Sequence, residues 1–276
     1  MGELLVAVLM GIIEGLTEFL PVSSTGHLIV AGELFNLSGE KGAAFEIFIQ
    51  LGAVLAVVWD YRRPLGETAR GVFSQAPARR FAAALCVAFL PAAAVGLLSH
   101  RWIEAHLFSS WSVAGALIVG GLAILAVEAV IRRRSRRPVK AAFRYDDAMA
   151  IPLSVAFWIG LAQVLSLYPG VSRAAATILG GLLVGLSRKA ATEFSFYLAI
   201  PTLGAACLFS LAQVARALSP GDAAAFAAGL ISAFITAAVV IRLFLAWVRS
   251  RDFKPFAWYR IALGLVLMLV LGWRGR

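Results

Sequence analysis

Charged residues are scarce in this chain of 276 residues. They make up 14% of it, whereas hydrophobic residues make up 61% and the mean hydropathy is +0.86. Soluble domains usually carry about 25% charged residues, so the composition excludes an ordinary soluble domain. Gly, Ala and Pro run through the apolar segments, which is typical of membrane helices and not of porin strands. We therefore expect an all-α polytopic integral membrane protein.

Cysteine is almost absent. Cys86 and Cys207 lie in apolar segments and form neither a CxxC pair nor a disulfide framework. No Lys or Arg precedes the first apolar run, and polar residues follow it directly, so we expect no cleaved signal peptide. The net charge of +10 does not predict a nucleic-acid partner, because the basic residues lie between apolar segments, as the positive-inside rule requires.

Six segments have the roughly 20 apolar residues that a helix needs to cross a bilayer. They are residues 43–61, 81–98, 111–131, 190–215, 224–247 and 258–274. Two further regions, 3–35 and 148–187, are apolar but interrupted by LPVSSTGH and YPGVSR. Irregular backbone at membrane depth is tolerated only inside protein or beside a water-filled cavity. Each interrupted region therefore predicts a re-entrant hairpin, in which a short helix, a polar turn and a second short helix follow one another.

The two interrupted regions resemble each other at an offset of 149 residues. The matches include Glu14 on Gln163, Val22 on Val171 and Ser23 on Ser172. We expect a single membrane domain of two repeats, 1–131 and 146–276, joined by a basic linker at 132–145. Each repeat has three full spans, an odd number, so the second repeat must be inverted. In inverted repeats, sites lie near the midplane where broken helices meet.

The distribution of basic residues predicts the orientation. Alternation of the spans places 17 Lys and Arg residues on one face, mainly in loops 62–80, 132–147 and 248–257, and 5 on the other. The first face is then cytoplasmic. Both termini and the opening of the site are expected on the outer, periplasmic side of the bacterial inner membrane. The hairpins enter from opposite sides, so their tips can meet inside the protein.

Ionisable groups inside a membrane are costly and usually functional. Glu14 and Glu18 are one helical turn apart and share a face. The two tips add further polar residues, namely Ser23, Ser24, Thr25 and His27 in the first and Gly170, Ser172, Arg173 and Thr177 in the second. Backbone amides at a new helix N-terminus and a guanidinium fork together predict an anion site. Arginine, amides, hydroxyls, a histidine and two carboxylates suit phosphoryl transfer.

Each of these residues also has a structural interpretation. The hydroxyl residues could cap the short helices. Glu14 and Glu18 could form a structural ion pair with Arg173. His27 could be a neutral, hydrogen-bonded core histidine. In the next span, Glu46 is expected at most to support the site.

The segments EGLTEFLPVSSTGH (14–27) and PGVSRAAAT (169–177) resemble the undecaprenyl-diphosphatase family, the bacitracin-resistance type of bacterial membrane phosphatase. The similarity covers essentially the whole chain, including FEIFIQLGAVLAV and EFSFYLAIP. The family pattern has an ExxxE segment, a downstream SSTGH and a PGxSRSxxT motif. This chain departs from it at Ala174, where the family commonly has serine, and so loses one hydroxyl at the second tip.

The resemblance implies hydrolysis of undecaprenyl diphosphate to undecaprenyl phosphate and inorganic phosphate. That reaction recycles the lipid carrier for peptidoglycan synthesis and confers bacitracin resistance. The resemblance also implies a divalent cation, Mg²⁺ or Ca²⁺, which the carboxylates of Glu14 and Glu18 would help to hold. The alternative catalytic role for these two glutamates is to orient His27. The expected partners are a polyprenyl diphosphate lipid and the surrounding membrane lipids, and a homodimer is left open.

We expect some residues of the site to bind the diphosphate and others to carry out the reaction. Arg173, Ser172 and the tip amides bind the diphosphate and stabilise developing charge. His27 is the general base or, less favoured, the nucleophile, and Ser24 activated by His27 is the alternative nucleophile. Positioning of the turn and phosphate falls to Ser23, Thr25, Gly170 and Thr177.

Two points remain open from the residues. Direct attack by water and a phospho-enzyme are both compatible with this set. The competing function is a polyprenyl-phosphate transporter or flippase that uses the same anion site, because inverted repeats with broken helices are a transporter architecture.

Overall fold

The computed structural model describes residues 2–35, 37, 39–107, 109–135, 143–214 and 220–274, and this part of the chain contains helices and no strands. The α-helices are α1 (Glu3–Thr17), α2 (Ser24–Phe35), α3 (Gly39–Asp60), α4 (Arg62–Gly71), α5 (Ala76–Leu107), α6 (Ser110–Ser135), α7 (Leu153–Val164), α8 (Arg173–Leu183), α9 (Arg188–Val214), α10 (Ala223–Val248) and α11 (Lys254–Arg274). Residues 136–142 of the expected basic linker lie outside the described residues, as do Arg216 and Arg276.

Within the described residues, six helices are long and apolar enough to cross a membrane. They cover Gly42–Asp60, Ala76–Ser99, Ser110–Arg134, Arg188–Ser210, Ala223–Val248 and Lys254–Trp273. Each overlaps one of the six spans expected from the sequence, so the prediction of an all-α polytopic membrane protein is confirmed. The helices of the two interrupted regions are shorter, and each pair is separated by a turn.

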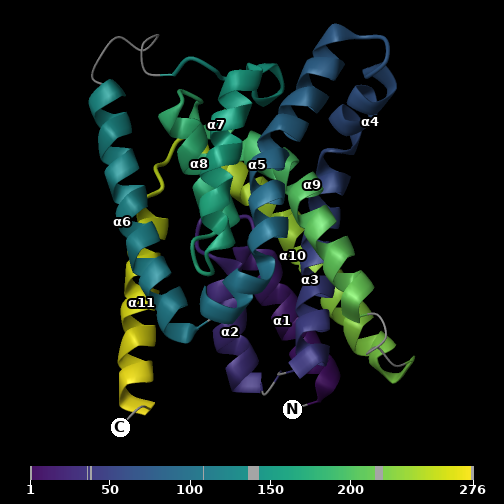
Figure 1. The fold of residues 1–276 in the computed structure, drawn as a ribbon, viewed down its shortest axis with the longest axis vertical. Coiled ribbons are helices and arrows are strands. Elements are labelled where there is room, and N and C mark those ends of the chain that lie inside the picture. Colours follow the sequence, from purple (N-terminus) through teal and green to yellow (C-terminus); the bar gives the residue numbers. More distant parts are fainter. Residues whose placement is uncertain are drawn as a thin grey trace.

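The two short-helix pairs lie at opposite ends of the molecule. In Figure 1, α1 and α2 occupy the lower part, together with both ends of the chain, and α7 and α8 occupy the upper part. The short helix α4 and the C-terminal end of α6 also lie at the upper end. The turn between α1 and α2 and the turn that leads from the 3₁₀ segment η3 (Leu165–Leu167) into α8 both point inward.

Elements related by the 149-residue offset make equivalent contacts. Helix α1 packs against α10, and α7 packs in the same way against α5. Ser23 and Ser172 share a left-handed backbone, with φ of 73° and 74°. Each accepts a hydrogen bond from the backbone N–H three residues later, that of Gly26 or Ala175. Positive φ is uncommon outside glycine, so this matched pair supports the repeat interpretation, whose boundaries stay a prediction.

The hairpin turns meet in a polar region between two apolar cores. The larger core joins α3 and α5–α11 around side chains such as Phe196 and Phe244, and the smaller one joins α1, α2, α3 and α10. Most of the buried polar and charged side chains belong to the hairpins or to the helices that contact them. The complete set of buried polar and charged side chains among the described residues is Glu14, Thr17, Glu18, Ser23, Ser24, Glu128, Gln163, Arg173, Thr177, Thr192, Ser195 and Arg260.

Candidate active site

A buried ion pair joins the two hairpins. Glu18 directly follows α1, and Arg173 is the first residue of α8. Glu18 Oε1 accepts a hydrogen bond from Arg173 Nη2 at 2.9 Å, with the two side chains only 5% and 7% exposed. Ser24 Oγ donates to the other oxygen, Glu18 Oε2, at 2.5 Å. One carboxylate therefore links the starts of α2 and α8, and the expected meeting of the tips is confirmed.

Arg173 is held by further contacts on its other side. Its Nη1 donates to the carbonyl oxygen of Ser195 at 3.1 Å and to Ser195 Oγ at 3.2 Å. Thr177 Oγ1 lies 2.7 Å from the same Ser195 Oγ, so Arg173 and Thr177 share a helix face as expected. The guanidinium also lies over the ring of Phe19, 5.6 Å from its centroid. These contacts fix the orientation of the arginine before any ligand binds.

Ser195 is a site residue that our sequence analysis missed. It lies within EFSFYLAIP, and the 149-residue offset places it on Glu46. That correspondence was the available signal, because Glu46 was already assigned to the surroundings of the site.

His27 has partners on both ring nitrogens. Nδ1 lies 2.7 Å from the carbonyl oxygen of Ser23, and Nε2 lies 2.6 Å from Tyr259 Oη on α11. A carbonyl can only accept, so Nδ1 carries a proton, and in the neutral ring Nε2 accepts from the Tyr259 hydroxyl. The rings stack in parallel with centroids 5.6 Å apart.

This geometry corrects one expectation about Ser24. The expected activation of Ser24 by His27 is not the arrangement in the structure, which pairs Ser24 with Glu18. A helical Cβ is tilted toward the helix N-terminus. As the first residue of α2, Ser24 therefore reaches back over the turn to Glu18, while His27 reaches Ser23 and Tyr259.

Glu14 is fully buried in α1. Both of its carboxylate oxygens are enclosed, and among the described residues neither has a hydrogen-bond partner. The charged groups that act on it are Glu18, Glu46 and Arg173. A buried carboxylate without a donor is costly, and a bound cation would offset this cost.

The donor set around Glu14 limits how a metal could be held. No cluster of three or more His, Cys, Asp or Glu side chains suited to a metal ion occurs in the described part of the chain. Mg²⁺ is usually bound by one or two carboxylates together with substrate phosphates. Glu14 and Glu18 fit a site in which two carboxylates and the substrate phosphates share the metal. They do not fit a site in which protein side chains supply all the ligands.

The remaining predicted residues shape the turns. Ser172 caps α8 by accepting from Ala175 N at 3.1 Å, so the capping interpretation holds for Ser172 and, through Gly26, for Ser23. Gly170 has φ of 92°, and its carbonyl accepts a hydrogen bond from Arg260. Thr25 is half-buried, and its role stays a prediction. Ala174 is fully buried and belongs to the larger apolar core.

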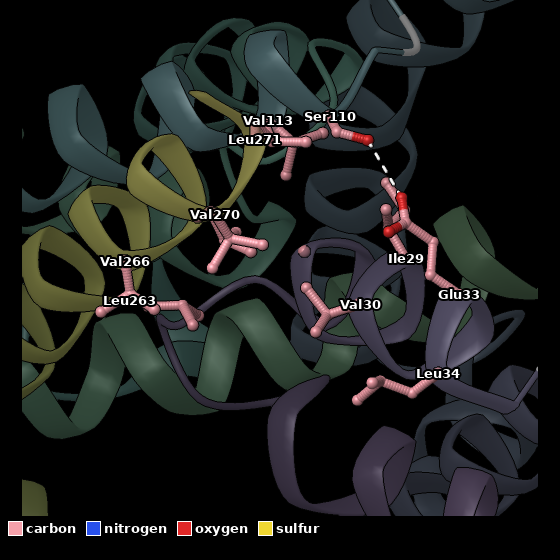
Figure 2. A pocket seen from close by; sticks show the side chains of 12 residues that line it. Ile29, Val30, Glu33, Leu34, Ser110, Val113, Leu263, Val266, Val270 and Leu271 are labelled. Atoms are coloured by element: carbon pink, nitrogen blue, oxygen red, sulfur yellow. Dashed lines mark hydrogen bonds between the residues drawn. The ribbon is translucent and has the colours of Figure 1, made fainter. Parts of the chain in front are cut away.

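An apolar cavity of about 230 Å³ has Gly26, the residue before His27, in its lining, and Figure 2 shows the side chains around it. Its walls come from α2, α11 and the start of α6. The lining residues are Gly26, Ile29, Val30, Glu33, Leu34, Ser110, Val113, Leu263, Val266, Leu267, Val270 and Leu271. Val30 and Leu263 lie about one helical turn beyond His27 and Tyr259. Polar groups and an apolar groove are therefore adjacent.

Comparison with known proteins places this arrangement in a family. Residues 7–266 match the family model described as "Bacitracin resistance protein BacA". The chain is 49% identical over 272 residues to the undecaprenyl-diphosphatase of Dechloromonas aromatica, covering 98% of this chain and 96% of that protein. It is 50% identical over 263 residues to undecaprenyl-diphosphatase 1 of Chromobacterium violaceum, covering 95% and 94%. The enzyme of Sorangium cellulosum is 52% identical over 265 residues, covering 95% and 84%. Since the match includes both hairpins and five of the six spans in full, the chain belongs to the bacitracin resistance protein BacA family.

Proposed function

We propose that this protein is a membrane phosphatase that hydrolyses undecaprenyl diphosphate to undecaprenyl phosphate and inorganic phosphate. The observation that carries the proposal is the buried connection from Ser24 through Glu18 to Arg173, which joins a hydroxyl, a carboxylate and a guanidinium at the meeting of two hairpins. The chain's membership of the BacA family supports the same activity. Its product renews the lipid carrier for peptidoglycan synthesis, and surplus activity confers bacitracin resistance.

The diphosphate headgroup binds at Arg173. Ser195 and Phe19 orient the guanidinium, and its Nε is buried with no acceptor among the described residues. Phosphate oxygens would satisfy Nε and replace Glu18 as the partner of Nη2, which frees Glu18 for proton transfer. The N-terminal amides of α8 add a second source of positive potential at the same place.

Ser24 is the nucleophile that the geometry favours. Its hydroxyl already donates to a carboxylate, whereas both nitrogens of His27 have other partners. Ser24 Oγ attacks the terminal phosphorus and its proton passes to Glu18. The P–O bond to the bridging oxygen breaks, and its electron pair leaves with undecaprenyl phosphate. Arg173 stabilises the negative charge that develops on the transferred group.

His27 serves the second step, in which water hydrolyses the phosphoserine. For this its Nε2 must exchange the Tyr259 hydroxyl for water, while Nδ1 keeps its hydrogen bond to the Ser23 carbonyl. His27 then takes the proton of the attacking water, and the P–O bond to Ser24 Oγ breaks. Glu18 returns its proton to Ser24 Oγ, and inorganic phosphate is released.

A divalent cation, Mg²⁺ or Ca²⁺, would be held by the carboxylates of Glu14 and Glu18. The unpartnered oxygens of Glu14 support this assignment. When bound, such a cation supplies positive charge to the diphosphate oxygens. The choice between Mg²⁺ and Ca²⁺ depends on the number of ligands and on the size of the cavity. The substrate phosphates would supply the ligands that the two carboxylates do not.

The polyprenyl chain would leave the headgroup site along the cavity between α2 and α11. This cavity is apolar, and its lining includes Gly26, which precedes His27, and Leu263, one helical turn after Tyr259. It lies toward the end of the molecule that carries both termini (Figure 1). The basic loops lie on the opposite face by span alternation, so we place the termini and the opening of the site on the outer side of the bacterial inner membrane.

A flippase is the second candidate, and it is not favoured. A carrier needs an anion site but has no use for a hydroxyl hydrogen-bonded to a buried carboxylate. The test is release of inorganic phosphate from undecaprenyl diphosphate by the purified protein in detergent, beside translocation of the labelled lipid across vesicles that contain the protein. Phosphate release is expected. Translocation of intact diphosphate without release would contradict the proposal.

A further inference from the structure

Arg260 has an unusual environment for a charged side chain. It lies in the second turn of α11 and is the largest of the fully buried side chains described. No carboxylate pairs with it among the described residues; its hydrogen-bond partners are backbone carbonyl oxygens. A lone arginine at membrane depth is expensive unless its donors are satisfied.

All five N–H donors of Arg260 reach carbonyl oxygens. Nε donates to Leu117 at 3.4 Å, Nη1 to Pro21 at 3.2 Å and Val171 at 3.0 Å, and Nη2 to Ala116 at 3.2 Å and Gly170 at 2.9 Å. A guanidinium has five such donors, so none remains for a ligand. Arg260 is therefore not an anion-binding residue in this arrangement.

The carbonyls belong to three separate elements. Pro21 lies in the turn of the first hairpin, Gly170 and Val171 lie in the turn of the second, and Ala116 and Leu117 lie in α6. One planar group thus fastens both hairpin turns to a membrane-spanning helix.

We propose that Arg260 is a positioning residue for catalysis, which sets the place of one hairpin turn relative to the other. Pro21 is three residues before Ser24, and Val171 is two residues before Arg173. A shift of either carbonyl therefore moves the nucleophile or the phosphate-binding arginine. The catalytic part of this inference rests on the proposed phosphatase function.

The contact between α6 and α11 is shaped to admit this side chain. A Cβ at Gly120 of α6 would lie 2.7 Å from Arg260 Cζ, so any larger residue displaces the guanidinium. Gly170 combines a positive φ with a Cβ position only 2.9 Å from Ala116 Cβ. The first repeat has no arginine equivalent to Arg260, because Trp111 occupies the matching position at the 149-residue offset.

The test compares three variants of the full-length protein in detergent. Arg260→Lys keeps the charge but has three donors for five carbonyls. Gly120→Ala keeps Arg260 and pushes its guanidinium. Gly115→Ala is the control, because its Cβ enters the same contact between α6 and α11 at an ordinary 4.0 Å from Met268 Cε and meets no atom of Arg260. For each we would measure kcat, KM for undecaprenyl diphosphate and the midpoint of thermal unfolding.

We expect Arg260→Lys and Gly120→Ala to lower kcat about 100-fold, which is the effect of misplacing reacting groups by about 1 Å. KM should change by less than about threefold, and Gly115→Ala should keep the kcat of the unmodified protein. Equal kcat losses in Gly120→Ala and Gly115→Ala would overturn the inference, because a general sensitivity of the contact between α6 and α11 would then explain both. An increase in KM at unchanged kcat would also overturn it and make Arg260 a phosphate ligand.

A kcat per folded molecule that stays unchanged in Arg260→Lys, with only a lower unfolding midpoint, would reduce Arg260 to a stabilising residue. Failure of the proposed function itself looks different. In that case the unmodified protein releases no phosphate, whatever the variants do.

Discussion

Ser24 Oγ lies 2.5 Å from Glu18 Oε2, and the second oxygen of that carboxylate pairs with Arg173. A single buried carboxylate is thus the partner of both the candidate nucleophile and the candidate phosphate ligand. Binding of a phosphate to Arg173 would release Glu18 from one partner and leave it bonded to the other. This order of events gives Glu18 its role as proton acceptor only when substrate is present.

Replacing Glu18 with glutamine should lower kcat by about 100- to 10,000-fold, because Ser24 loses its proton acceptor. The substitution also leaves Arg173 without a counterion, and breaking a buried ion pair costs about 3–5 kcal/mol. Steady-state rates and the free energy of unfolding would check the two effects. Glu18→Asp, which keeps the charge on a shorter side chain, serves as the control and should lose less stability. A Glu18→Gln variant with full activity would remove Glu18 from the chemistry.

Phosphate should accumulate on Ser24 when His27 is replaced by alanine, because the second step then lacks its base. Rapid acid quenching followed by peptide mass spectrometry would locate the phosphoryl group. Ser24→Ala is the companion variant and should carry no phosphate. A labelled histidine in the unmodified protein, or turnover without any phospho-enzyme in His27→Ala, would argue for a different route.

Tyr259→Phe should raise the rate of phosphoserine hydrolysis by about three- to tenfold, because water then reaches His27 Nε2 without displacing a hydrogen bond worth about 0.5–1.5 kcal/mol. The parallel stacking of the two rings survives this change. Tyr259→Ala removes the ring as well and should lose this gain, because His27 then also loses its stacking partner. Equal activity in all three proteins would show that the orientation of His27 does not depend on Tyr259.

Glu14→Gln should raise the Mg²⁺ concentration for half-maximal activity by about tenfold or more, the size of effect usual when a group that supports a metal is lost. The unfolding midpoint should not fall, because a buried amide costs less than a buried carboxylate that has no donor. Glu3→Gln, at the exposed start of the same helix, is the control. Loss of stability in Glu14→Gln with normal cation dependence would assign Glu14 a structural role.

Val30→Trp should fill part of the cavity between α2 and α11 and raise KM for undecaprenyl diphosphate about tenfold. The increase in KM should be smaller for a diphosphate with a short prenyl chain. Such a chain buries fewer CH₂ groups in the cavity, and each buried CH₂ contributes about 0.8 kcal/mol to binding. Val119→Trp, on an exposed position of α6, provides the comparison. A tryptophan at Val30 that leaves both KM values unchanged would place the chain elsewhere.

The sequence was sufficient for the spans and the interrupted hairpins, because about 20 apolar residues and their interruption are direct consequences of the bilayer. The ion pair was also within reach, since Arg173 needed a carboxylate and only a few lie in apolar segments. Which glutamate would pair was left open, and the structure selects Glu18.

Other features depended on distances that no pattern reveals. Tyr259 and Arg260 lie near the start of the last span, where aromatic and basic residues ordinarily indicate a membrane interface. Their contacts with residues more than 230 positions earlier, His27 and Pro21, exist only because α11 packs against α6, which in turn contacts α2 of the first hairpin. The pairing of Ser24 was equally hidden, because it depends on the left-handed backbone at Ser23 and on the first turn of α2.

The most direct measurement is phosphate release from undecaprenyl diphosphate by the purified protein in detergent, compared with Arg173→Ala and Ser24→Ala prepared in the same way. The account predicts steady release by the unmodified protein and a loss of about 100-fold or more in each variant, with all three proteins folded. Release that survives both substitutions would contradict it, because the chemistry would then occur away from the meeting point of the two hairpins.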